Sequence, residues 1–352
     1  MSLGLAGVYI IFLMFIPLCL WGMHKEPEHN GDISLMSLDD SNYLKGVSAC
    51  GVFLAHSYNY LHTNNISNIN LLIPFSLLGG MGVLMFLFTG GYGIYKSFEK
   101  TNKMQLKSYW YKRLTNVYIP AVIINAIIAV AICAVQNDWS ITQIAITGFF
   151  GGWYINVVML EYLSFCIAAL ITRDKKKILM LMLIFNLALF VLFTYLDLDA
   201  RWRNGLFVYP FGIFVASYEE KLRKILLKKW KSIFAINATI FVFGGGIFTY
   251  YKGTLGADIM KNIAGCALAM ICLCIFENWK MGNRIIYEIG KRSLYIYLIH
   301  LGVLQIIENG KKLYSVEPAW NVVVLLVSSV ILTEIAYRIY DIITRGLLRI
   351  KR

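Results

Sequence analysis

The chain has 352 residues, of which 58% are hydrophobic and 15% are charged, and its formal net charge is +13. Soluble domains average about 45–50% apolar and about 25% charged residues, so this composition excludes a soluble single-core enzyme, a disordered chain and a small disulfide-linked secreted scaffold. A membrane-spanning helix takes about 20 apolar residues, so the length suffices for about ten or eleven crossings with their connecting loops.

Eleven apolar runs follow one another along the chain. They cover Leu3–Gly22, Leu44–Leu61, Leu71–Tyr95, Thr115–Val135, Trp153–Ile171, Ile178–Leu196, Gly205–Tyr218, Ser232–Tyr251, Ile263–Glu277, Leu294–Glu308 and Ala319–Tyr340. The pattern predicts an all-α integral membrane protein, with a ten-helix transmembrane bundle and one extra N-terminal transmembrane helix. The predicted units are an extra helix (1–23), an acidic linker (24–43), the ten-span membrane domain (44–345) and a basic cytoplasmic tail (346–352).

The first apolar run resembles a secretory signal peptide only in part. It lacks a basic segment before the apolar stretch and an obvious small-residue cleavage site, and both are features of a signal peptide. We therefore expect Leu3–Gly22 to be retained as a transmembrane helix.

Lys and Arg are distributed unequally between alternate connections. One set of connections carries 24 of them and the other set carries 6. Cytoplasmic loops are enriched in Lys and Arg, so the distribution places the C-terminus in the cytoplasm and, with eleven crossings, the N-terminus outside. The positive charge is divided among short loops, which argues against the continuous basic face of a nucleic-acid-binding protein.

Lys45 and His56 lie within one predicted span, where ionisable side chains are costly and often functional. Eleven residues correspond to three helical turns plus about 20°, so the two side chains share a face about 16 Å apart along the axis. We expect them to line one cavity, with Lys45 at its cytoplasmic mouth and the imidazole deep inside. The alternative is a snorkelling lysine next to a histidine that only joins neighbouring helices.

Glu161 and His300 also lie at predicted membrane depth. Glu161 is a candidate for orienting an imidazole or binding a hydroxylated substrate, or it is a protonated, hydrogen-bonded structural group. His300 follows Tyr297 at the i,i+3 spacing that places side chains side by side on a helix. Tyr297 and His300 are candidate supporting groups, and the alternative is that they only form a hydrogen bond in helix packing. Glu334 and Arg338 are spaced i,i+4 and indicate a structural ion pair.

The predicted outer loop at 197–204 carries Arg201, Trp202 and Arg203. This combination suits either an anionic or sugar ligand, with the two arginines as candidate acceptor-binding groups, or an anchor at the membrane interface. The seven cysteines lie in apolar runs without CxxC spacing, so neither a metal site nor disulfides are expected.

Six segments resemble, in order, motifs of the membrane-bound acyltransferase 3 family. They are YLKGVSACGVFLAH, LMFLFTGGYGIYKS, WYKRLTNVYIP, WYINVVMLEYL, VYPFGIFVASYEEKL and IGKRSLYIYLIH. The first contains a basic residue followed after ten residues by histidine, the second the aromatic glycine-rich segment, and the third the basic stretch that ends in Ile-Pro. The resemblance extends from about Tyr43 to Arg345.

The resemblance implies a multi-pass enzyme of the bacterial cytoplasmic (inner) membrane. It would transfer an acyl group, usually acetyl, from acetyl-CoA or another acyl-CoA to a hydroxyl of a surface glycan or glycolipid, without a metal. His56 then corresponds to the essential histidine, Lys45 stands in place of an arginine, and Arg113 matches the basic stretch. The sequence departs from the family pattern at Lys45, at Asn116 in place of a second arginine, and at Thr89 in place of serine.

The expected mechanism assigns the phosphates of the donor to Lys45 and Arg113. His56 either takes the proton of the acceptor hydroxyl or briefly accepts the acyl group itself. Tyr297, His300 or Thr89 is expected to donate to the thioester oxygen. Two other functions remain open at this point. One is a flippase or exporter of a lipid-linked glycan, and the other is a membrane sensing domain without catalysis.

Overall fold

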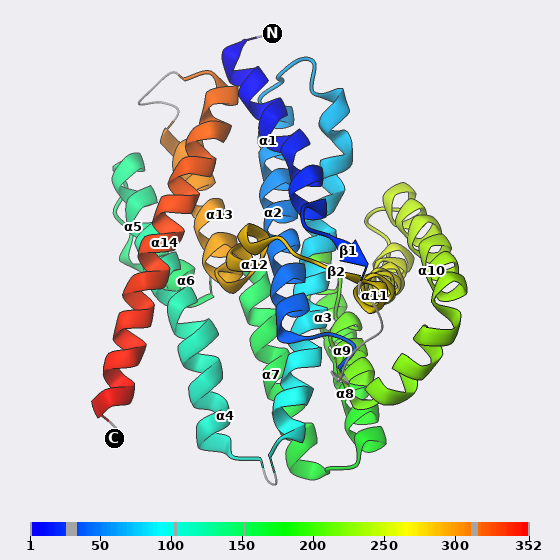
Figure 1. Cartoon of the computed structure of the whole chain (residues 1–352). Coiled ribbons are helices and arrows are strands. Elements are labelled where there is room, and N and C mark those ends of the chain that lie inside the picture. Colours follow the sequence, from blue (N-terminus) through cyan, green and yellow to red (C-terminus); the bar gives the residue numbers. More distant parts are fainter. Residues whose placement is uncertain (1, 26–33, 102–103, 151, 311–315, 351–352) are drawn as a thin grey trace.

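The computed structural model describes residues 2–25, 34–101, 104–150, 152–310 and 316–350 (Figure 1). Residues 26–33 of the predicted acidic linker and the last two residues of the predicted basic tail lie outside the described residues. The described chain forms these α-helices: α1 (Leu3–Leu20), α2 (Leu38–Thr63), α3 (Leu78–Glu99), α4 (Leu106–Arg113), α5 (Ile119–Gln136), α6 (Ile141–Phe150), α7 (Trp153–Ile171), α8 (Lys175–Tyr195), α9 (Val208–Ser217), α10 (Glu219–Tyr250), α11 (Leu255–Asn278), α12 (Arg284–Lys291), α13 (Ser293–Gly310) and α14 (Pro318–Ile350). Short helical turns precede α3 (η1, Asn70–Leu77) and α9 (η3, Ala200–Trp202), and a π-helical turn joins α4 to α5 (η2, Leu114–Tyr118).

Eight helical segments of the described chain are long and apolar enough to cross a bilayer, which confirms the predicted all-α membrane protein. They are α1, η1 with α3, α4 with α5, α7, α8, α10, α11 and α14. The three remaining predicted spans correspond to α2, α9 and α13. Helix α2 contains Asp39, Asp40 and Lys45, α9 has only 10 residues, and the 18-residue α13 contains His300 and Glu308.

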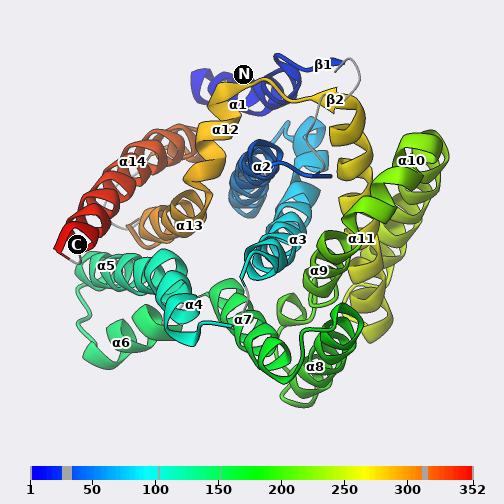
Figure 2. The same ribbon diagram turned by 60° about the horizontal axis from the view of Figure 1, so that its bottom comes forward.

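Helices α2 and α3 lie at the centre of the molecule, and the other helices surround them (Figure 2). Helix α2 begins at a capping box, in which Ser37 Oγ accepts from Asp40 N at 3.1 Å and Asp40 Oδ2 accepts from Ser37 N at 3.0 Å. Glycines bring α3 close to α9, because a Cβ atom on Gly91 would lie 2.0 Å from the Tyr209 carbonyl oxygen. Small residues allow such backbone contact between membrane helices.

Helix α1 is fixed against the other helices. Its side chains Val8 and Phe12 are fully buried. The carbonyl oxygens near its C-terminal end accept hydrogen bonds from Tyr43 Oη and, at 2.6 Å, from Asn283 Nδ2. The chain then forms strand β1 (His24–Lys25), which pairs in antiparallel register with β2 (Trp279–Lys280).

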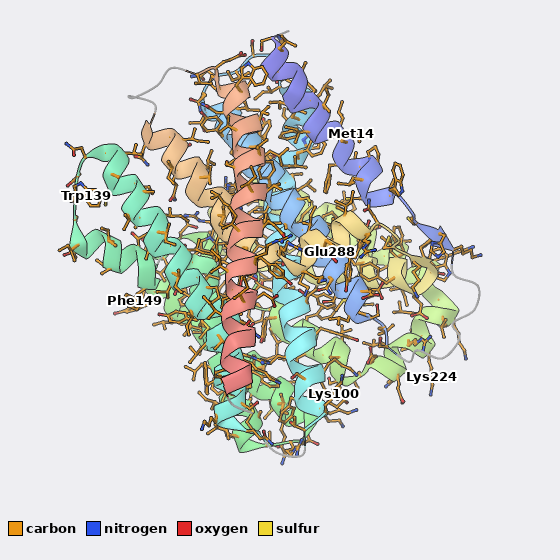
Figure 3. All side chains as sticks on the ribbon, turned by 60° about the vertical axis from the view of Figure 1, so that its left-hand side comes forward. Met14, Lys100, Trp139, Phe149, Lys224 and Glu288 are labelled. Atoms are coloured by element: carbon orange, nitrogen blue, oxygen red, sulfur yellow. The ribbon has the colours of Figure 1, made fainter. Side chains whose placement is uncertain are left out.

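Three helices lie within segments that we expected to be connecting loops. Helix α4 lies in the predicted cytoplasmic connection before the fourth span and continues through η2 into α5. The predicted outer loop between the fourth and fifth spans contains α6, which packs along α5. Trp139 and Phe149, labelled in Figure 3, are exposed apolar side chains at the two ends of this region. The predicted cytoplasmic connection at 278–293 contains the short helix α12, which begins at the side-chain cap of Asn283.

The two ends of the chain lie at opposite ends of the molecule (Figure 1). An odd number of crossings requires this arrangement. The assignment of the C-terminal end to the cytoplasm remains a prediction from the distribution of Lys and Arg.

Candidate functional site

Two cavities are stacked along α2 and α3. The larger has a volume of about 710 Å³ and lies between the C-terminal half of α2, the start of α3, the 199–204 loop and α13. The smaller has a volume of about 440 Å³ and lies between the N-terminal part of α2, the C-terminal half of α3, α7 and the start of α13. According to the predicted orientation in the membrane, we name the larger one the outer cavity and the smaller one the inner cavity.

His56 lines the outer cavity. Its ring centroid lies 5.4 Å from that of His300, with the two planes tilted by 48°. Among the described residues, no hydrogen bond to either ring nitrogen of His56 occurs. The imidazole is therefore available to a molecule in the outer cavity.

His300 is fully buried behind His56. Its Nδ1 lies 2.6 Å from the Ile296 carbonyl oxygen, and its Nε2 has no partner in the described part of the chain. A carbonyl oxygen only accepts hydrogen bonds, so Nδ1 carries the hydrogen in this contact. The backbone bond fixes the orientation of this ring next to the base candidate.

Tyr297 lines both cavities and lies between them. Its ring packs against Tyr154 at 4.9 Å, against His300 at 6.1 Å and against Phe86 at 6.3 Å between centroids. These aromatic side chains form a partition, of which Phe86 and Tyr154 face the inner cavity.

Lys45 lines the inner cavity, whereas His56 lines the outer one. Our expectation that the two side chains share one cavity is therefore wrong. Helical spacing places them on one face of α2, but the aromatic partition around Tyr297 divides the space in front of that face.

Thr89 and Asn116, which the sequence resemblance singled out, both line the inner cavity. Thr89 Oγ1 donates back to carbonyl oxygens of its own helix, at 3.0 Å to Met85 and 3.1 Å to Phe86. Since a hydroxyl has one hydrogen to donate, Thr89 as placed here does not offer it to a ligand.

Arg113 lies at the end of α4, near the inner cavity. Its guanidinium carbon is 4.7 Å from the ring centroid of Tyr109 and 5.6 Å from that of Tyr162. Tyr162 also lines the inner cavity, so Arg113 is placed behind one wall of this cavity.

The end of α12 adds a further cation to the inner cavity. Lys291 lines this cavity, and its Nζ lies 3.1 Å from Glu288 Oε1. Arg292 donates from Nη1 to Glu288 at 2.6 Å and from Nε to Glu334 at 2.8 Å. The hydrogen bonds from Arg292 and Lys291 hold the pKa of the Glu288 carboxyl below its usual value.

The two arginines of the outer loop have different environments. Arg201 lines the outer cavity and donates to Asp199 from Nε at 2.8 Å and from Nη2 at 3.3 Å. These bonds hold the pKa of Asp199 below its usual value. Arg203 is buried and forms an ion pair with Asp258 at 2.8 Å, so it holds the loop against α11 and does not face the cavity.

Glu161 lines neither cavity. It is fully buried between α7 and α8, where Asn186 Nδ2 donates to its Oε2 at 3.1 Å. The placement corresponds to the structural alternative considered for this residue. The predicted pair of Glu334 with Arg338 is present at 2.6 Å.

Sequence reasoning missed several lining residues. They include Trp153 and Lys261 in the outer cavity and Lys291 in the inner one. Lys261 stands just before a predicted span, in a segment expected to be a loop. A basic residue next to a predicted span on the outer side is unusual, because outer loops carry few cations, and this position could have indicated a functional role for Lys261. Among the described residues, no group of three His, Cys, Asp or Glu side chains is placed to hold a metal ion.

A family model described as an acyltransferase domain, acyltransferase 3, matches residues 38–338. The match begins at the first residue of α2 and covers both cavities. It leaves out α1, the 24–37 linker and the C-terminal end of α14. No curated protein and no solved structure matches the chain.

Proposed function

Because the chain belongs to the acyltransferase 3 family, and its helices form a multi-pass membrane protein, we propose that it transfers an acyl group, typically acetyl, from an acyl-CoA to a glycan hydroxyl. The acyl-CoA enters the inner cavity and the acceptor enters the outer cavity. The single observation that carries this proposal is that His56 and Lys45 face two stacked cavities that meet at Tyr297.

The inner cavity suits the donor. Lys45 and Lys291 line it, and the described residues that line it include no carboxylate. Ammonium groups attract the phosphates of a nucleotide thioester. Lys45 provides charge without the two-pronged grip of a guanidinium, so phosphate binding by this cavity depends on several contacts rather than one.

The outer cavity suits a hydroxylated acceptor. Trp153, Tyr297 and Phe248 provide aromatic surface, while Asn59 and Asn125 provide polar groups. A cavity of about 710 Å³ is within the range of about 300–1,000 Å³ typical of sites for small molecules. A sugar unit of a surface glycan or glycolipid fits these dimensions and this lining.

His56 acts as the general base in the proposed reaction. It takes the proton of the acceptor hydroxyl as the hydroxyl oxygen attacks the thioester carbonyl carbon. The carbon–sulfur bond then breaks, the coenzyme leaves as a thiolate, and the proton on His56 neutralises the thiolate. The products are an ester on the acceptor and free coenzyme A.

Because Tyr297 lines both cavities, the two substrates react next to this side chain in the proposed mechanism. The acyl end of the donor approaches from the inner cavity and the acceptor from the outer cavity, next to the ring of His56. Tyr297, which lines both cavities, is the candidate donor to the developing oxyanion, because the Thr89 hydroxyl bonds to its own helix. In this arrangement, the thioester does not cross the membrane.

The proposed location is the bacterial cytoplasmic membrane, with the inner cavity open to the cytoplasmic pool of acyl-CoA. Inverted and right-side-out membrane vesicles test this arrangement. Labelled acetyl-CoA added outside inverted vesicles is expected to label the glycan in the lumen, whereas right-side-out vesicles are expected to remain unlabelled. Equal labelling of both preparations would contradict the proposal.

Two stacked cavities also suit a flippase or exporter, which moves its substrate from one cavity to the other. Such a protein consumes no thioester. Release of free coenzyme A, measured with a thiol reagent in the same vesicles, separates the two functions. Glycan translocation without thiol release would favour the exporter.

A further inference from the structure

The outer cavity carries an excess of positive charge. Lys252, Lys261 and Arg201 line it, and Asp199 is the single carboxylate among the described lining residues. These cations come from segments that we predict to be outer, where Lys and Arg are scarce. All three line the same cavity: Lys261 is partly buried, whereas Lys252 and Arg201 are exposed.

Lys261 is partly buried and lies in the field of Asp258 and Asp199, but it forms no ion pair of its own within the described residues. Its Nζ lies 4.4 Å from the ring centroid of Phe248, and a Cβ atom on Gly80 would lie 3.2 Å from the same nitrogen. In the part of the chain that the structure describes, no carboxylate lies within ion-pair distance of it. An ammonium group that has lost part of its hydration is stabilised by an anion, so a bound anionic group is favoured here.

The loop that carries Arg201 is held rigidly against the helix that carries Lys261. Arg203 pairs with Asp258 at 2.8 Å. Asn262 accepts two backbone N–H groups of the loop at 3.0 and 2.9 Å and donates to two carbonyl oxygens at 3.0 and 2.9 Å. Lys261 therefore lies between two residues that fix the loop, and the site is preorganised for a ligand.

Arg201 keeps hydrogen-bond donors for a ligand. It uses Nε and Nη2 to bind Asp199, which leaves Nη1 without a partner among the described residues. Its side chain is 63% exposed. A guanidinium in this state fits the oxygens of a carboxylate or phosphate.

We propose that Lys261, Lys252 and Arg201 form an anion subsite in the outer cavity, which binds a carboxylate or phosphate group on the acceptor. The inference rests on the proposed function in that the acceptor occupies the cavity that contains His56. The donor phosphates are expected in the inner cavity, with Lys45 and Lys291. The acceptor is thus an acidic glycan or glycolipid, with the anion at this subsite and the reacting hydroxyl near His56.

Direct binding tests the subsite without catalysis. Titration calorimetry of the purified full-length protein in nanodiscs uses methyl glucuronide, methyl glucoside 6-phosphate, inorganic phosphate and neutral methyl glucoside. We expect at least one charged sugar to bind more tightly than the neutral one. The Lys261→Met variant is expected to weaken that binding about 10- to 100-fold, which corresponds to the loss of a charge-assisted contact.

Two further variants control for folding and for general charge. Lys261→Arg is expected to keep most of the binding, because it keeps the cation. Lys224→Met removes an exposed cation near the start of α10 (Figure 3), whereas the lining residue Phe248 lies near the other end of this helix, and we expect no effect. A variant that melts at the wild-type temperature and loses only the charged ligand supports the subsite.

The outcomes separate the subsite from the proposed function. Equal binding of charged and neutral sugars, or unchanged binding in Lys261→Met, would overturn the subsite even if acyl transfer is observed. Charge-selective binding that depends on Lys261 supports the subsite even if labelled acetyl-CoA yields no ester, in which case only the proposed reaction fails. Preference for the glucuronide or for the two phosphates identifies the anion.

Discussion

The outer and inner cavities share the side chain of Tyr297 but differ in the chemistry of their walls. The outer cavity contains the imidazole of His56, three cations and a rigid loop. The inner cavity contains Lys45 and Lys291, aromatic side chains and a wall of closely packed glycine-containing helices. The difference indicates that the two substrates are recognised separately, so substitutions in one cavity should affect one substrate and leave the other unchanged.

The largest effect is expected from the base in the outer cavity. His56→Ala should lower the rate of acyl transfer about 10²- to 10⁴-fold, the usual contribution of a general base, while binding of acyl-CoA persists. Transfer of radiolabelled acetyl groups and equilibrium binding of acetyl-CoA measure the two properties. His62→Ala, an exposed histidine on the same helix that lines neither cavity, is the control. A His56→Ala protein with a normal rate of transfer would show that the outer cavity does not contain the general base.

The buried ion pair beneath the outer loop should have the next largest effect. Arg203→Met leaves Asp258 buried and uncompensated, and such a loss costs about 3–5 kcal/mol. Arg201→Met breaks an exposed pair and should cost less than about 1 kcal/mol. Denaturation of both variants in the same detergent measures the difference. Equal stabilities would show that the loop does not depend on Arg203.

A smaller effect is expected at the glycine contact behind the inner cavity. In Gly212→Ala, the new methyl group would lie 2.3 Å from the Phe88 carbonyl oxygen, and overpacking of this kind costs about 1–3 kcal/mol. Gly245→Ala on α10 has no atom within 4 Å of the new methyl group and should be neutral or slightly stabilising. Thermal melting curves compare the two variants, and a wild-type melting temperature for Gly212→Ala would contradict the contact.

The smallest effect is expected at the cation of the inner cavity. Lys45→Met should raise the KM for acyl-CoA about 10-fold, as expected for one charge-assisted contact, and leave the KM for the acceptor unchanged. Lys100→Met at the exposed end of α3 is the matched control (Figure 3). Initial rates at varied donor and acceptor concentrations separate the two constants. A change in the KM for the acceptor alone would show that Lys45 contacts the acceptor and not the acyl-CoA donor.

Hydropathy predicted most of the helices because apolar runs near 20 residues long have few alternatives to a membrane span. Hydropathy did not indicate helices α4, α6 and α12, because they are short and lie between such runs. Asn283, which caps α12 through its side chain, was an available signal, since Asn is among the residues preferred at helix N-caps.

The candidate site was only partly predictable. Periodicity placed His56 and Lys45 on one face of α2, but it carries no information about Tyr297 of α13, which divides the space in front of that face. The ion pair of Arg203 with Asp258 joins residues 55 positions apart. Such contacts depend on how helices pack, which local sequence patterns do not encode.

The attachment of α1 has a practical consequence for any shortened version of the protein. The family match begins at residue 38, yet Val8 and Phe12 are fully buried and the end of α1 accepts hydrogen bonds from Tyr43 and Asn283. Trimming the chain to the family boundary would uncover an apolar strip on α2 and α14 and release the start of α12. The N-terminal segment is therefore a structural part of the working unit.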